Sequence, residues 1–203
     1  MADAQKLAEI VGEVCGEVLQ SIVVARGETT VEIAPEHVID TLKTLRDHAD
    51  LAFEQLVDVC GVDYTTYGTD SQAPEAATTV AAPHLAVVYH LLSLTHNHRI
   101  RVRARLDPER PVVDSVVDLW PVANWFEREA FDLFGVVFQG HPDLRRLLTD
   151  YGFIGHPFRK DFPLWGHVEM RYDEKKGRVV YEPMSIEPRI LVPRIRRNEG
   201  YRG

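Results

Sequence analysis

The chain has 203 residues, 45% of them hydrophobic and 27% charged, which is the composition of an ordinary globular protein with one substantial core. Its apolar runs are far shorter than the roughly 20 residues needed to cross a bilayer, and its two cysteines are too few for a disulfide framework, an iron–sulfur cluster or a structural zinc site. The net charge of −8 is uneven, because residues 1–60 hold 12 acids and 4 bases whereas residues 157–203 hold 7 acids and 11 bases. This distribution argues against a general nucleic-acid binder and predicts a basic end that is merely solvated or that meets an acidic protein surface or anionic lipid.

The first residues hold neither the apolar core of a signal peptide nor the arginine-rich bias of a transit peptide, so we expect a mature cytoplasmic protein. Residues 3–19 place apolar side chains at helical spacing, which predicts an amphipathic helix. Two short strands around a turn at Gly27 follow, and a second helix is expected from Pro35 to about His48, because proline is tolerated in a first turn. Residues 53–64 are expected to begin as a helix and to end as a strand.

Two strands are predicted in the middle of the chain. They follow residues 67–83, which show no apolar period and are expected to form a long surface loop or a partly disordered one. Residues 84–94 are apolar on both faces, as a central strand would be, and residues 99–106 alternate strictly between apolar side chains and arginines. The arginine face is typical of a solvated sheet face with cross-strand acids nearby, although it would also suit an acidic partner; it consists of Arg99, Arg101, Arg103 and Arg105.

The next predicted helix begins near Ser115, breaks at Pro121 and ends at Gly135, because a glycine that can take positive φ suits a helix end. Shorter elements are expected after it: a strand at 136–138, a turn at 140–142, a helix at 144–148, and a hairpin over 168–183 with its turn at 174–177.

Antiparallel strand pairs with helices between them predict an α+β fold, in which helices pack on a mixed, largely antiparallel sheet. We expect a globular α+β domain over residues 1–150. An extended C-terminal arm that contains the β-hairpin is expected over residues 151–203.

Charged residues are unusually placed in the segment EREAFDLFG, residues 127–135, whose other side chains are mostly apolar or aromatic. On a helix, such residues leave little face for water, so the carboxylates of Glu127, Glu129 and Asp132 need partners. Those partners are expected within this chain, with Arg145 and Arg146 as candidates, or across a subunit interface, and the spacing does not separate the two. Catalysis by paired carboxylates is an alternative, but an arginine, Arg128, lies among them.

The histidines raise a metal hypothesis, since His141 and His156 stand in similar phrases, GHPDLRR and GHPFRKD, with Asp143 and Asp161 nearby. Their spacing matches no metal motif with a known mechanism, and tight turns explain Gly-His-Pro as well. The sequence also contains no phosphate loop or dinucleotide fingerprint.

From about Ser115 to Pro183 the chain closely resembles the C subunit of NADH:quinone oxidoreductase, which is the thirty-kilodalton subunit family of respiratory complex I. The phrases VDVCGVDY and VVYHLLSL carry a looser resemblance in the N-terminal half, and the ending MSIEPRILVPRIRRNEGYRG departs from the longer aromatic endings of many members. The motifs that carry the close match are Glu127-Arg128-Glu129, Asp132-Leu133-Phe134-Gly135, His141-Pro142, Arg145-Arg146 and Pro157-Phe158-Arg159-Lys160-Asp161.

The resemblance implies a non-catalytic structural subunit of the peripheral arm, on the cytoplasmic face of a bacterial inner membrane, with no cofactor of its own and no nucleic acid. FMN, iron–sulfur clusters, NADH and a quinone would belong to the complex. The implied partners are the large quinone-site subunit and its cluster-bearing neighbours, and the membrane would be met only through the complex. Alternatives are the equivalent subunit of a membrane-bound nickel–iron hydrogenase complex, or a stand-alone hydrolase or metal enzyme using the His141, Asp143, His156 and Asp161 group. We expect partner contacts or structural ion pairs, and no catalytic role, at Glu127, Arg128, Glu129, Asp132, His141, Arg145, Arg146, Phe158, Arg159, Lys160 and Asp161.

Overall fold

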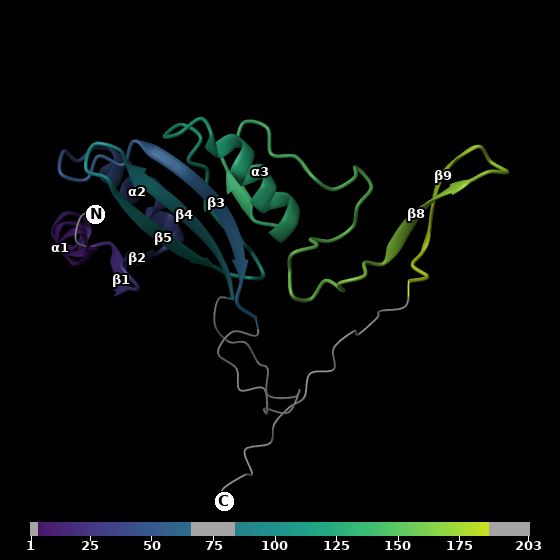
Figure 1. Ribbon diagram of the computed structural model, residues 1–203, viewed down its shortest axis with the longest axis horizontal. Helices are drawn as coiled ribbons and strands as arrows, with labels where there is room; N and C mark the ends of the chain where they lie inside the picture. The colour runs from purple at the N-terminus through teal and green to yellow at the C-terminus, as the bar shows by residue number, and fades with distance from the viewer. Residues whose placement is uncertain (1–3, 66–83, 187–203) are drawn as a thin grey trace, which may run out of the picture. The chain divides into compact units, whose positions relative to one another are not determined.

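The structure, a computed structural model, describes residues 4–65 and 84–186. They fall into two compact units that divide between Phe162 and Pro163. The elements of the first unit are α1 (Ala4–Cys15), β1 (Leu19–Ala25), β2 (Glu28–Ile33), the 3-10 helix η1 (Pro35–His37), α2 (Val38–Asp47), β3 (Gln55–Asp63), β4 (Leu85–Ser93), β5 (His98–Leu106), β6 (Val112–Asp114), α3 (Ala123–Phe134) and β7 (Val137–Gln139) (Figure 1).

The centre of the first unit is a five-stranded sheet with the strand order β1-β2-β5-β4-β3. Only β2 and β5 run parallel in it, and the other neighbouring strands are antiparallel. Helix α3 lies beside the edge strand β3, whereas α1 contacts β1 and β2 at the other edge (Figure 1). The predicted α+β fold with a mixed, largely antiparallel sheet is therefore confirmed.

Strict alternation in β5 separates the core from the opposite face of the sheet. The side chains of Ile100, Val102, Ala104 and Leu106 are buried and belong to one hydrophobic core with residues of α1, α2 and α3. The arginines between them face the other way and meet acids of β2: Arg101 lies 2.6 Å from Glu28, and both Arg103 and Arg105 contact Glu32. The interpretation of this face as a row with cross-strand acids is confirmed.

Two predicted helical segments are not helices. Residues 53–64 contain no helical turn, because β3 pairs with β4 from the Gln55–Leu92 pair to the Asp63–Leu85 pair, and this pairing overrides the weak local helix preference. The helix expected from Ser115 begins only at Ala123, so residues 115–122 are the second such segment. The strand β6 at residues 112–114, which pairs in parallel with β7, was not predicted.

The helix expected at residues 144–148 is also wrong, since this segment forms bends. Its backbone N–H groups point at a carboxylate of α3 instead of at carbonyls one turn earlier. The predicted helix end at Gly135 is confirmed, because this glycine takes a left-handed conformation with φ 74°.

The second unit contains the hairpin of β8 (Val168–Asp173) and β9 (Arg178–Pro183). Its turn is stabilised by the Asp173 carboxylate, which accepts hydrogen bonds from the backbone N–H groups of Lys175 and Lys176. The predicted hairpin is thus confirmed, whereas the predicted loop at 67–83 and the arm beyond residue 186 lie outside the described residues. Whether residues 1–150 form a domain by themselves stays a prediction. Within the described parts of the chain, no helix has the length and apolarity to cross a bilayer.

Candidate functional site

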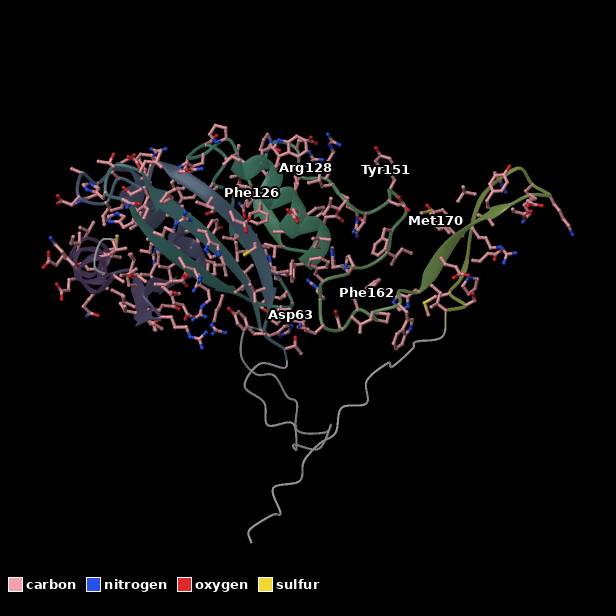
Figure 2. The ribbon with its side chains drawn as sticks, in the orientation of Figure 1. Asp63, Phe126, Arg128, Tyr151, Phe162 and Met170 are labelled. Atoms are coloured by element: carbon pink, nitrogen blue, oxygen red, sulfur yellow. The ribbon has the colours of Figure 1, made fainter. Side chains whose placement is uncertain are left out.

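Helix α3 and the loop that follows it, residues 141–162, hold most of the charged residues singled out from the sequence (Figure 2). The first of them, Glu127, is fully buried near the start of the helix. Its carboxylate accepts hydrogen bonds from the Ser115 hydroxyl at 2.6 Å and from the Val116 N–H at 2.7 Å. Burial raises the pKa of Glu127 to about 7, although these two hydrogen bonds lower it. Glu127 therefore fixes the segment before α3 and stops it from joining the helix.

His141 lies beside Glu127, with its Nε2 atom 4.0 Å from the carboxylate. The imidazole Nε2–H donates to the carbonyl of Asn124, and Nδ1 accepts from the N–H of Asp143. Both ring nitrogens are thus used in the way that suits one neutral tautomer. This arrangement ties the Gly-His-Pro turn to α3 and leaves His141 engaged with the backbone.

Arg128 is buried, with 4% of its surface exposed, although it carries a full charge. Its guanidinium donates to the carbonyls of Arg145 and Arg146, at 3.2 and 3.4 Å, and lies 5.2 Å from the ring centroid of Trp125. Two carbonyls and an aromatic face therefore take the place of a carboxylate partner.

Asp132, one turn later, is fully buried and organises the loop. Its carboxylate accepts hydrogen bonds from the N–H groups of Leu147, Leu148 and Thr149, at 3.0, 2.7 and 2.9 Å, and pairs with Arg146 at 2.9 Å. Burial alone would raise the pKa of Asp132, but the Thr149 hydroxyl and these N–H donors lower it well below its ordinary value. An ionised carboxylate thus holds residues 146–149 against the helix.

The last carbonyls of α3, those of residues 132–134, are capped by the same loop. The donors are Nδ1 of His156, the N–H of Phe158 and Nε of Arg159, at 3.0, 3.1 and 2.6 Å. A side chain at Gly135 would place its Cβ 2.6 Å from Nε2 of His156, so this cap requires glycine there. The loop therefore supplies hydrogen-bond donors to the last carbonyls of α3, which have no partners within the helix.

The remaining predicted residues lie toward the surface. Glu129, Lys160 and Asp161 are exposed, and Arg145 pairs with Asp143 at 2.8 Å on the outside of the loop. The backbone N–H of Lys160 donates to the carboxylate of Asp63 at the end of β3. Interface roles for the eleven predicted residues stay predictions.

The loop also exposes apolar side chains that sequence reasoning did not single out, Phe158 excepted. We call Leu148, Tyr151, Ile154 and Phe158 the apolar loop residues; their exposed fractions are 62%, 102%, 87% and 58%. Figure 2 shows Tyr151 projecting outward from the loop. The available signal in the sequence was an aromatic-rich and glycine-rich stretch with no helical period, in which burial is not expected.

The metal hypothesis finds no support in the geometry. Among residues 4–65 and 84–186, no three His, Cys, Asp or Glu side chains gather in a way that could hold a metal ion. His141 and His156 each bind a backbone carbonyl, of Asn124 and Asp132 respectively.

Comparison with known proteins gives a consistent result. The family described as "Respiratory-chain NADH dehydrogenase, 30 Kd subunit" matches residues 31–168. A Neisseria meningitidis serogroup B protein, named as the C subunit of NADH-quinone oxidoreductase, is 53% identical over 204 residues, covering 100% of both chains. The protein of that name from Ralstonia nicotianae is 56% identical over 189 residues, covering 93% of this chain and 90% of its own. A solved structure, the trypsin-resistant fragment (1-134) of Nqo5, is 32% identical with a TM-score of 0.55, covering 68% of this chain and 99% of the fragment.

Proposed function

The chain belongs to the family of the 30-kDa subunit of respiratory-chain NADH dehydrogenase, and we propose that it holds other subunits of that complex together without carrying chemistry itself. The single observation that supports this role best is the loop of residues 141–162. A buried carboxylate, Asp132, fixes its backbone, and the loop then presents the apolar loop residues to solvent.

Exposed apolar side chains of this size mark interaction sites when they stand on ordered backbone, because burying them in a partner releases water without a large loss of chain entropy. Tyr151 and Ile154 are almost wholly exposed in the chain alone. The contacts of Asp132, Arg146 and His156 already hold the loop backbone in one conformation, so little further chain entropy is lost when a partner binds. Docking is therefore the function that this geometry suits.

The buried charged residues of α3, which are Glu127, Arg128 and Asp132, are occupied with structural contacts, so we expect the chemistry elsewhere in the complex. An iron–sulfur cluster takes about four thiolates, and this chain has only Cys15 and Cys60. Burial raises the pKa of Cys60 to about 11, which keeps that thiol protonated and unreactive. We expect FMN, iron–sulfur clusters, NADH and quinone to be bound by other subunits.

The expected partners are the large quinone-site subunit and the cluster-bearing subunits next to it, in the peripheral arm on the cytoplasmic face of a bacterial inner membrane. The experiment that tests the role is affinity purification of the full-length tagged chain from detergent-solubilised membranes, with quantification of the subunits that co-purify. Tyr151→Ser combined with Ile154→Ser is compared with Leu94→Ser, whose side chain is 65% exposed in the turn after β4.

We expect the double variant to fold with an unchanged melting temperature and to recover the partner subunits at least about tenfold less well, while Leu94→Ser recovers them normally. Normal recovery by the double variant would show that the apolar loop residues are not the docking element. Recovery of hydrogenase subunits in place of NADH dehydrogenase subunits would show that the chain belongs to a membrane-bound hydrogenase complex.

A further inference from the structure

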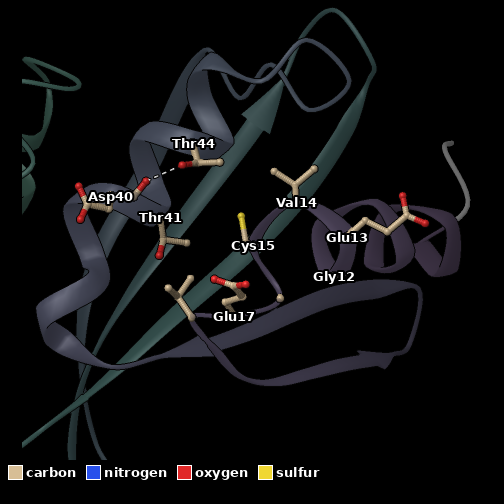
Figure 3. A pocket seen from close by; sticks show the side chains of 10 residues that line it. Gly12, Glu13, Val14, Cys15, Glu17, Asp40, Thr41 and Thr44 are labelled. Carbon is tan, nitrogen blue, oxygen red and sulfur yellow. Dashed lines mark hydrogen bonds between the residues drawn. The ribbon is translucent and has the colours of Figure 1, made fainter.

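A pocket of about 520 Å³ lies between the C-terminal end of α1 and helix α2, at a distance along the chain from the loop of residues 141–162 (Figure 3). Residues 12–18 form one wall, and Asp40, Thr41 and Thr44 form the other. We call this space the acidic pocket. It is large enough for the head of an amino-acid side chain or a small organic molecule.

All the charged side chains that line the acidic pocket are acidic. Glu13, Glu17 and Asp40 line it, and none of its ten lining residues is basic. The last turn of α1, which also lines it, contains no basic residue to complement the negative partial charge of a helix C-terminus. Burial raises the pKa of the Cys15 thiol, so the negative charge comes from the carboxylates and the helix end. The electrostatics therefore favour a cation.

The wall formed by α2 also contains a buried hydroxyl group, that of Thr41, that makes no hydrogen bond within the described residues. Only 2% of the surface of Thr41 is exposed. The hydroxyl of Thr44, one turn away, donates to the carbonyl of Asp40 at 2.8 Å. Figure 3 shows the Thr41 hydroxyl and the Glu17 carboxylate directed into the same space. A buried hydroxyl without a partner costs free energy, which a ligand with an N–H donor would recover.

The geometry points to a guanidinium or primary ammonium group as the ligand of the acidic pocket, with the Glu17 carboxylate as its counter-ion and the Thr41 hydroxyl as a second acceptor. A divalent metal ion does not suit these groups, because no metal-holding cluster of three His, Cys, Asp or Glu exists among the described residues. Nitrogen cations carry several N–H donors on an extended body, and they can reach a carboxylate and a hydroxyl at once. Such a group arrives either as the ammonium of a free amine or as the guanidinium of an arginine side chain of a polypeptide.

The test is an NMR titration of the full-length, isotope-labelled chain with two probes. N-acetyl-argininamide carries a guanidinium on a neutral peptide backbone, and putrescine carries free ammonium groups. We expect saturable shifts at Gly16, Glu17 and Thr41 with a Kd of about 1–10 mM for at least one probe. Tighter binding of N-acetyl-argininamide identifies a polypeptide side chain as the source, and tighter binding of putrescine identifies a free amine.

Two variants in the acidic pocket and one control outside it make the proposal specific. Glu17→Gln should weaken binding at least about fivefold, whereas Glu36→Gln, an exposed acid outside the pocket, should leave the Kd unchanged. Thr41→Val should weaken binding and at the same time raise the melting temperature of the free chain, because it removes an unsatisfied buried hydroxyl. Shifts that do not saturate, or a Kd for Glu17→Gln equal to that of the parent, would overturn the proposal.

Discussion

The carboxylate of Asp132 lies 2.9 Å from the guanidinium of Arg146, and the two residues connect three segments of the chain. Asp132 projects from α3, Arg146 stands in the loop, and the Nη2 atom of Arg146 also donates to the carbonyl of Gly155 at 3.0 Å. The guanidinium lies 5.8 Å from the ring centroid of Phe153 as well. One ion pair thus links a helix, the bend after it and the turn that caps the helix, so its loss should loosen all three together.

Asp132→Asn should destabilise the chain by about 3 kcal/mol, because one carboxylate oxygen accepts from three N–H groups and the other from Arg146, whereas an amide has a single accepting oxygen and no charge to pair with Arg146. Urea unfolding measures this change, and amide hydrogen exchange at residues 147–149 should become faster. Asp143→Asn is the matched control, since Asp143 pairs with Arg145 at the surface, where solvent screens the pair, and its loss should leave the free energy of unfolding nearly unchanged. Equal effects of the two substitutions would contradict the role given to Asp132.

Gly135→Ala should cost about 2–4 kcal/mol, of which about 1–2 kcal/mol is the strain of alanine at positive φ. The rest arises because the new Cβ would lie 2.6 Å from Nε2 of His156 and would push the ring off the end of α3. Gly140→Ala isolates the strain, since Gly140 has φ 82° and no heavy atom within 4 Å of an added Cβ. Thermal unfolding should therefore rank Gly140→Ala as the milder change, and the reverse ranking would rule out the His156 cap.

Glu127→Gln should change the pH dependence of stability. The pKa of Glu127 is raised to about 7 in the folded chain from an ordinary value of 4.5, so the unfolded state releases this proton first as the pH rises. The stabilising contribution of the protonated group is full below pH 4.5 and is lost as the pH passes through 7. Glutamine stays neutral, accepts from the Val116 N–H and donates to the Ser115 hydroxyl.

We therefore expect Glu127→Gln to match the parent near pH 4.5 and to exceed its stability by about 1–3 kcal/mol at about pH 8. Urea unfolding of both proteins across this range gives the difference directly. Glu129→Gln, which changes an exposed glutamate on the same helix, is the matched control for the loss of a carboxylate. A constant difference between Glu127→Gln and the parent would mean that Glu127 is already ionised when folded.

The strands β1, β2, β4 and β5 and the helix end at Gly135 could be predicted because their signals are local. Period-two alternation in residues 99–106 and a glycine after an apolar helix depend on neighbouring residues alone. The need of the α3 charges for partners also followed from sequence, since a helix with apolar residues on most sides must bury them.

The partners themselves could not be predicted, because most are backbone groups of distant segments. Residues 144–148 have helical composition, yet the N–H groups of Leu147 and Leu148 donate to the carboxylate of Asp132. They are therefore not available for the hydrogen bonds of a helix. In the same way, Glu127 takes the N–H of Val116 and delays α3 until Ala123. The caps at His156 and Arg159 lie beyond residue 150, where the sequence suggested that the globular domain ends.

Arg128→Ala should reduce the amount of assembled complex far more than Arg101→Ala. Arg128 is buried and donates to two carbonyls of the loop, so alanine leaves those carbonyls without donors and a space beside Trp125, at a cost of about 3 kcal/mol. Arg101 is half-exposed and pairs with Glu28, whose side chain is 63% exposed, and such a pair contributes about 0–1 kcal/mol. A loss of about 3 kcal/mol is a large part of the stability of an ordinary domain and depletes the folded subunit.

The two variants also separate a structural role of Arg128 from a chemical one. Each is expressed as the full-length tagged chain, and the intact complex is quantified before quinone reduction is measured. Because the guanidinium of Arg128 is engaged by backbone carbonyls and Trp125, activity per mole of intact complex should equal that of the parent in both variants. If Arg128→Ala assembles in normal amounts and turns over slowly, the structural interpretation of the charges in EREAFDLFG is wrong. If it assembles poorly but turns over normally per mole, the buried guanidinium serves the fold of the loop and, through it, the docking of the subunit.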